Sequence, residues 1–180
     1  CHLLSSLYGE HDPIPLQVDD LGTVVAARPR GPLTHQLSWQ LLSAEDFERL
    51  MYLLFSDTPG YENAAWLQKT TAADRGRDLS VTRVVTDGLS SVRRMRTIVQ
   101  CKHWLSRSVG PGDVGQARDQ MALWHPPRVD DLIIATSGRF TADAIQLVET
   151  HNQEDRALTI SMWPESHLER LLAARPHLIA

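Results

Sequence analysis

The sequence predicts an α/β domain in which a mixed β-sheet is flanked by helices on both faces. Two observations predict this class. The early strands are joined by tight turns, whereas the later strands alternate with helices, an order typical of a mixed sheet covered on both sides. One later strand, residues 131–136, is a compact apolar run, as expected of a strand buried on both faces.

The composition is that of an ordinary globular domain. The chain has 180 residues, of which 42% are hydrophobic and 22% charged, enough for one domain with a sizeable core. Residues 1–40 are polar and interrupted by prolines, so we expect an N-terminal extension or linker there and the folded domain over 41–180. With only two cysteines and no long apolar run, a cytoplasmic protein without a membrane span is expected.

The first strong element is a helix that begins after Ser43. Ser43 and Asp46 form the pattern of a capping box, in which the hydroxyl accepts from the third backbone N–H of the helix. Apolar residues then recur at helical spacing up to the Thr58-Pro59-Gly60 break: Phe47, Leu50, Met51, Leu54 and Phe55. A strand centred on residues 64–68 is expected next, and a turn at 74–77 leads to an alternating strand over 78–85.

The second half continues with a basic loop, two further strands and three helices. We expect the loop at 87–95, a strand at 96–102, and a helix from about residue 112 that ends before Pro126. After the apolar strand at 131–136, Thr141 caps a helix. A strand at 157–163 and a helix at 165–174 complete the chain.

Basic charge is concentrated in one part of an otherwise acidic chain. The net charge of −4 argues against a generally basic nucleic-acid binder. Between residues 83 and 107, however, Asp87 is the only acidic residue among six basic ones: Arg83, Arg93, Arg94, Arg96, Lys102 and Arg107. Lys and Arg side chains supply most sequence-independent affinity for phosphates, although a solvated hairpin tip would show the same grouping.

A carboxylate, an amide and a lysine lie on two neighbouring strands. Asp78 opens one strand, and Gln100 and Lys102 point to the same face of the next. Hard oxygen donors beside an ammonium are what metal-dependent phosphodiester cleavage requires, and the main-chain carbonyl of Cys101 offers a third ligand. The spacing alone is weak, because Asp78 could cap a turn and Lys102 could protect a sheet edge.

Four motifs in order resemble the Mrr-type restriction endonucleases of the PD-(D/E)xK superfamily. They are a Phe-Glu helix at 43–50, an Asp-x-x-x-Asp turn into a strand at 74–79, a Gln-x-Lys strand at 99–102, and a strand, turn and helix at 133–144. The resemblance covers residues 43–176. It implies a restriction-endonuclease-like fold with catalysis by Asp78, Gln100 and Lys102, supported by Glu48.

The resemblance also implies a metal ion and a nucleic-acid partner. Asp78, Gln100 and the carbonyl of Cys101 would hold Mg²⁺, for which Mn²⁺ could substitute. The expected DNA contacts are the basic side chains near these motifs and one glutamine of the helix that follows: Arg75, Arg77, Arg93, Arg94, Arg96, Arg107 and Gln116. Arg75 and Arg77 stand where the family has glycines.

The function implied is a metal-dependent endodeoxyribonuclease in restriction or antiphage defence. Because the chain begins with Cys1 rather than Met, we expect it to be the nuclease effector domain of a longer polypeptide that carries recognition or activation modules. A homodimer would allow both DNA strands to be cut together. Two alternatives stay open on the same fold, namely a non-catalytic nucleic-acid-binding module and an RNase.

Overall fold

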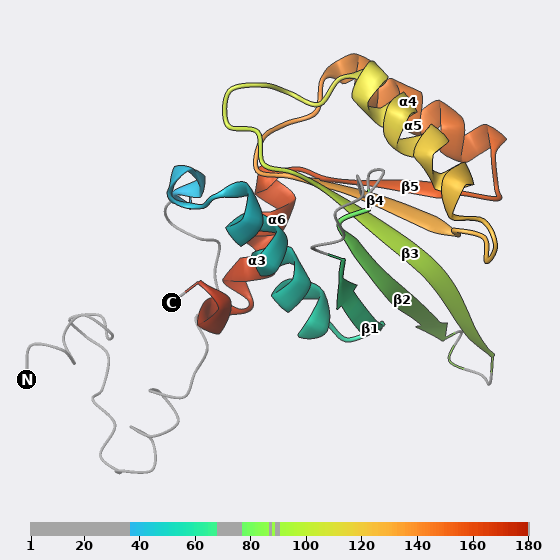
Figure 1. Cartoon of the computed structure of the whole chain (residues 1–180), viewed down its shortest axis with the longest axis horizontal. Helices are drawn as coiled ribbons and strands as arrows, with labels where there is room; N and C mark the ends of the chain where they lie inside the picture. The colour runs from blue at the N-terminus through green and yellow to red at the C-terminus, as the bar shows by residue number, and fades with distance from the viewer. Residues whose placement is uncertain (1–36, 68–76, 87, 89–90, 180) are drawn as a thin grey trace, which may run out of the picture. The chain divides into compact units, whose positions relative to one another are not determined.

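The structure, a computed structural model, describes residues 37–67, 77–86, 88 and 91–179. Within this part of the chain, five strands form one sheet in the order β1-β2-β3-β4-β5 (Figure 1). β1 (Tyr61–Trp66), β2 (Leu79–Thr86) and β3 (Val92–Lys102) pair antiparallel, and β4 (Asp131–Thr136) and β5 (Thr159–Trp163) continue the sheet in parallel. The predicted mixed α/β sheet is therefore confirmed.

One face of the sheet is covered by α3 (Ala44–Ser56) and α6 (Glu165–Ala173). The capping box at the start of α3 forms as predicted, because Ser43 accepts from the Asp46 N–H and Asp46 accepts from the Ser43 N–H. The helix buries its apolar stripe against the sheet. The fully buried side chains of this cluster include Phe47, Met51, Leu54, Phe55, Leu79, Val99, Ile133, Leu168 and Leu172.

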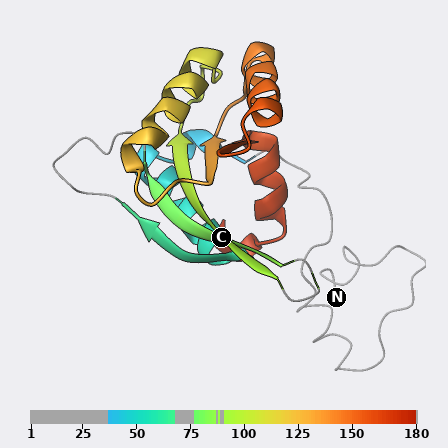
Figure 2. The same cartoon turned by 90° about the vertical axis from the view of Figure 1, so that its right-hand side faces the viewer.

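The other face is covered by α4 (Pro111–Gln120) and α5 (Ala142–Glu154), which lie next to each other above the strands (Figure 2). Thr141 caps α5 by accepting from the Ala144 N–H at 3.2 Å, as expected. A short 3₁₀ turn, η2 (Met121–Trp124), follows α4. Ile98, Leu132, Ile134 and Ile160 of the sheet and Val114, Ala117, Ala144 and Val148 of the helices form the second buried cluster.

The prediction of a basic loop over residues 87–95 is wrong at the C-terminal end of that range. β3 begins at Val92, and its first residues continue the antiparallel ladder with β2, where Val85 pairs with Arg93 and Thr86 with Val92. The backbone hydrogen bonds of this ladder continue close to the hairpin tip, and such pairing between two strands is not visible in the turn and charge signals of the sequence. Arg93 and Arg94 therefore lie on the strand near the hairpin tip.

The chain divides into two units, residues 1–32 and 33–180. The first unit lies outside the described residues, so the boundary predicted at residue 40 stays a prediction. The turn η1 (Trp39–Leu41) precedes α3, and Trp39 is buried with its indole N–H donating to Glu169 at 3.3 Å. No helix of the described residues is long and apolar enough to span a membrane.

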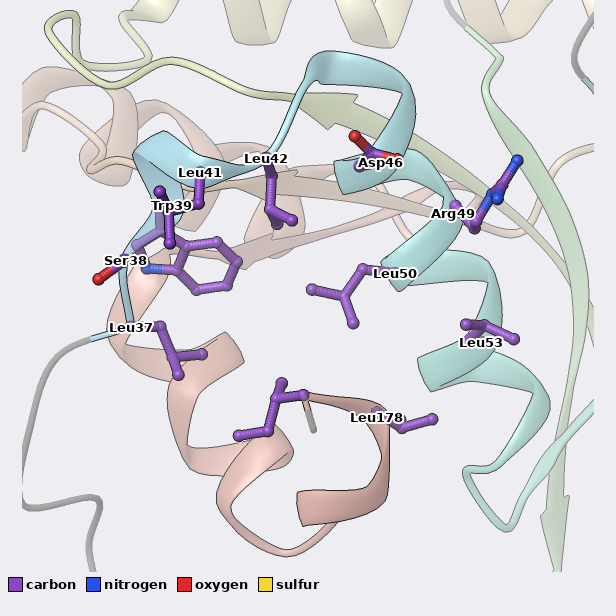
Figure 3. A pocket seen from close by; sticks show the side chains of 11 residues that line it. Leu37, Ser38, Trp39, Leu41, Leu42, Asp46, Arg49, Leu50, Leu53 and Leu178 are labelled. Atoms are coloured by element: carbon purple, nitrogen blue, oxygen red, sulfur yellow. The ribbon is translucent and has the colours of Figure 1, made fainter.

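An apolar pocket of about 340 Å³ opens between η1, the outer side of α3 and the C-terminal turn η3 (Pro176–Leu178), as Figure 3 shows. Leu37, Leu42, Leu50 and Leu178 contribute to its walls. The described residues that line the pocket include none of the predicted catalytic ones.

Candidate active site

Asp78 lies directly before β2, with its carboxylate against the neighbouring strand. Its Oδ2 accepts a hydrogen bond of 2.5 Å from the backbone N–H of Cys101, and its own N–H donates to the carbonyl of Val99 at 3.2 Å. A carboxylate that accepts from a backbone N–H is held in one orientation. The start of β2 thus places the Asp78 carboxylate beside the Gln100-Cys101-Lys102 segment.

Gln100 and Lys102 share the sheet face that α4 covers, as the strand alternation predicts. Gln100 is only 8% exposed, and its amide Nε2 donates to Oε1 of Gln120 at 3.4 Å. Cys101 points to the opposite face and packs against the cluster under α3 and α6. The Gln-x-Lys segment therefore presents both polar side chains toward α4, Gln100 near the last residue of the helix and Lys102 near Asp113 in its first turn.

Lys102 is half-buried between carboxylates and an indole. Its Nζ lies 4.7 Å from the ring centroid of Trp104. Burial lowers the pKa of the Lys102 ammonium, and Arg107 acts in the same direction, whereas the carboxylates of Asp113 and Asp78 oppose the shift. The charge of Asp78 therefore acts on the Lys102 ammonium, so the two predicted catalytic groups interact electrostatically.

Glu48 approaches the site from α3. Its Oε2 accepts from the indole N–H of Trp66 at 3.2 Å. Burial raises the pKa of the Cys101 thiol well above its usual range, and the negative charges of Asp78 and Glu48 add to this effect. Glu48 therefore lies on the Cys101 side of β3, while Gln100 and Lys102 lie on the other side.

Two of the predicted DNA-binding arginines converge near η2. The guanidinium of Arg77 lies 3.7 Å from the ring centroid of Trp124, and that of Arg96 donates to the carbonyl oxygens of Trp124, at 2.7 Å, and Pro127. Burial lowers the pKa of Arg77, and the nearby Arg96 adds to the shift. Arg75 lies outside the described residues.

The remaining predicted contacts are spread more widely. Arg94 pairs with Glu62 at 3.5 Å near the hairpin tip, and Arg93, one residue earlier in β3, is about 30 Å along the strand from Lys102. Arg107 pairs with Asp113 at 2.5 Å beside Lys102. Gln116 is exposed on α4, and it is Gln120, one turn later on the same face, that contacts Gln100.

This arrangement can be compared with known proteins. A family model described as a restriction endonuclease, the Mrr catalytic domain, matches residues 40–172. The chain belongs to this family. It is an Mrr-type domain of the PD-(D/E)xK superfamily, as the four motifs predicted. A search of curated proteins found no match, and a search of solved structures found none either.

The metal ligands predicted for this Mrr-type domain are one charged carboxylate oxygen and two neutral carbonyl oxygens. Among the described residues, no group of three or more His, Cys, Asp and Glu side chains is arranged to hold a metal ion. The predicted donors, the Asp78 carboxylate, the Gln100 amide oxygen and the Cys101 carbonyl, are hard oxygens, and Mg²⁺ prefers such ligands and retains waters. The Cys101 thiol packs against the cluster on the opposite face of the sheet, so only the main chain of Cys101 is a suitable donor beside Gln100.

Three residues of the Mrr-type site were missed by the sequence analysis. Gln120 contacts Gln100, Trp104 contacts Lys102, and Asp113 acts on Lys102 through its charge. Gln120 follows Gln116 at helical spacing, which is the one signal in the sequence that could have identified it. Trp104 lies in the loop after β3, where strand alternation no longer applies, and an indole there is equally typical of core packing.

Proposed function

We propose that the chain is a metal-dependent endodeoxyribonuclease that hydrolyses DNA phosphodiester bonds. Membership of the restriction endonuclease family supports nuclease activity in general. The observation that carries the specific proposal is the 2.5 Å hydrogen bond from the Cys101 N–H to the Asp78 carboxylate. This contact brings the only carboxylate of the proposed donor set to the Gln-x-Lys strand.

Each residue has a role that follows from its chemistry. Asp78, Gln100 and the carbonyl of Cys101 would hold Mg²⁺ or Mn²⁺, and the ion would supply the Lewis acidity that polarises a phosphate oxygen. Lys102 stabilises the negative charge that develops on the phosphate during attack by water, because its ammonium lies in the same half-buried environment as Asp78. Glu48 supports the site with a second carboxylate from α3.

DNA binding is assigned to the basic residues around this centre. Arg107 lies beside Lys102, Arg77 and Arg96 lie at η2, and Arg93 and Arg94 extend the basic residues along the β2–β3 hairpin. Neutralisation of phosphates by these side chains would give affinity without reading base sequence. Sequence recognition or activation would then come from other modules of a longer restriction or antiphage-defence protein, and a homodimer would cut both strands.

Cleavage of plasmid DNA in Mg²⁺ tests the proposal. Asp78→Ala and Lys102→Ala remove the donor and the ammonium, and Asp143→Ala removes an exposed carboxylate from the first turn of α5 as a matched control. Cutting by the wild type and Asp143→Ala, but not by the two site variants or after chelation, supports the enzyme. Equal cutting by all four proteins contradicts it. Binding of DNA without cutting by the wild type favours a binding module, and cutting of RNA alone favours an RNase.

A further inference from the structure

The side chain of Lys102 rests against one tryptophan. Its Nζ is 4.7 Å from the ring centroid of Trp104, and the guanidinium carbon of Arg107 is 4.1 Å from the same ring. Both distances fall within the range in which the negative face of an indole attracts a cation, and tryptophan is the strongest of the aromatic side chains in this respect. Trp104 therefore contacts two cations at the end of β3.

The main chain that carries this contact is closely held. The carbonyl of Lys102 accepts from the N–H of Trp104 at 2.9 Å and from the hydroxyl of Thr136 at 2.8 Å. A Cβ atom at Gly138 would lie 2.5 Å from the carbonyl oxygen of Trp104, so only glycine permits the close approach of these two segments. The fold thus fixes the backbone of Lys102 and Trp104. The remaining conformational freedom is that of the Lys102 side chain.

The second cation is held by a carboxylate. Asp113 accepts from Arg107 at 2.5 Å and from the backbone N–H of Gly110 at 2.9 Å, at the start of α4. The bond from Gly110 fixes the Asp113 carboxylate, and the bond from Arg107 holds that guanidinium and offsets its charge, which otherwise would repel Lys102. Asp113 also attracts the Lys102 ammonium directly. The negative charge of Asp113 therefore offsets the repulsion between Arg107 and Lys102, the two cations that share the ring of Trp104.

We propose that Trp104 is a positioning residue whose indole holds the Lys102 ammonium beside Gln100 on the α4 side of the sheet. The inference rests on the proposed function for its catalytic consequence. A lysine side chain has a flexible four-carbon stem, so an ammonium without a partner surface samples many rotamers. A ring that retains it keeps the charge where the phosphate would react, and an ordered group of this kind contributes to rate through preorganisation.

The chain offers a direct measurement of this contact, because Lys69 and Lys102 are its only lysines. Labelling lysine with ¹³C at Cε gives two side-chain signals, which Lys102→Arg assigns. Protons above an aromatic face are shifted upfield, so the Lys102 signal is expected upfield of lysine in an unstructured peptide. Trp104→Leu should move it downfield, and Trp104→Phe should keep most of the shift. An unchanged Lys102 signal in Trp104→Leu overturns the inference.

Kinetics on DNA then test the positioning role. Trp104→Leu should lower kcat about tenfold with KM little changed, and Trp104→Phe should recover to within about threefold of wild type. Trp39→Leu serves as a control, since it removes a buried indole from the cluster under α3 and α6 and should lower stability without moving the Lys102 signal. A shifted signal with unchanged kcat also overturns the inference.

Failure of the proposed function would be visible separately. A wild-type protein that cuts neither DNA nor RNA contradicts the nuclease, and with it the catalytic consequence of the contact. The lysine spectrum decides in the same sample whether Trp104 holds the ammonium, because it needs neither substrate nor metal ion.

Discussion

The amide of Gln100 donates from Nε2 to Oε1 of Gln120 at 3.4 Å, across the interface between β3 and α4. Only the oxygen of an amide can bind a metal ion, since its NH₂ group has no available lone pair. The contact with Gln120 uses the nitrogen and so determines which end of the amide faces away from α4. A neutral ligand needs this orientation, whereas a carboxylate has two equivalent oxygens.

Replacement of Gln120 by Leu should weaken metal binding roughly tenfold, the lower end of the effect seen for residues that orient metal ligands. The reason is that the Gln100 amide loses the acceptor that holds its nitrogen. Titration calorimetry with Mn²⁺ in the absence of DNA measures this affinity. Gln146→Leu makes the same chemical change on the exposed side of α5 and should leave the affinity unchanged. Equal affinities in all three proteins would show that Gln120 does not orient the ligand.

Replacement of Gln100 by Glu should tighten metal binding by about tenfold or more, because a full negative charge replaces an amide dipole at the ion. The amide of Gln120 would have to turn over so that its NH₂ group donates to the new carboxylate. In this background, Gln120→Leu should change Mn²⁺ affinity less than about twofold, since either carboxylate oxygen can bind. No gain in affinity for Gln100→Glu would count against Gln100 as a ligand.

Local signals explain how much of this site was visible in the sequence. The capping box of Ser43 and Asp46 is a short-range pattern, and it forms as expected. The alternation that places Gln100 and Lys102 on one face also depends only on strand geometry. The sequence could not show how closely α4 approaches the polar residues of β3. Gln116 and Gln120 lie on one face of α4, but how far the helix extends over β3 depends on the packing of both layers.

The hairpin shows the opposite limit. The Asp87-Gly88 turn signal and the run of basic charge favoured a loop that includes Arg93 and Arg94, yet both pair with β2. Strand pairing joins two separate segments of the chain, so the local sequence around one strand does not reveal where the pairing ends. The aromatic contact of Trp104 with Lys102 was missed for a related reason, because the loop after β3 has no periodic pattern that would define which way the indole points.

Titration of Asp131 should contribute to the pH dependence of the free energy of unfolding. Burial raises the pKa of this carboxyl, with its 3.4 Å ion pair to Arg83 opposing the shift. A carboxyl with a raised pKa binds more protons in the folded state than in the unfolded one, so its contribution to the free energy of unfolding falls as pH rises from below about 4 through the folded-state pKa. Replacement by Asn removes this term.

Thermal unfolding of the wild type and Asp131→Asn between pH 3.5 and 7 measures the effect. The Tm of the variant relative to the wild type should rise with pH over the lower part of this range and then level off. The carboxyls of Asp46 and Asp113, whose pKa values are lowered, do not act on Asp131, so they titrate equally in both proteins and cancel in the comparison. A difference in Tm that is constant with pH would contradict the buried, hard-to-ionise state of Asp131.

Phe47 connects the fold to the site, because it is a fully buried residue of α3 whose ring stacks on His103 at 5.4 Å, next to Lys102. His103 in turn contacts the carbonyl of Leu42 through Nε2 at 2.9 Å, so the start of α3 and the end of β3 are held together.

Phe47→Ala should lower the free energy of unfolding by about 3–5 kcal/mol in urea titrations, since it removes a large core side chain and leaves a cavity. Leu41→Ala is the control, because Leu41 is 80% exposed and its truncation should cost less than about 0.5 kcal/mol. Similar losses in the two variants would contradict the packing of α3 on the sheet.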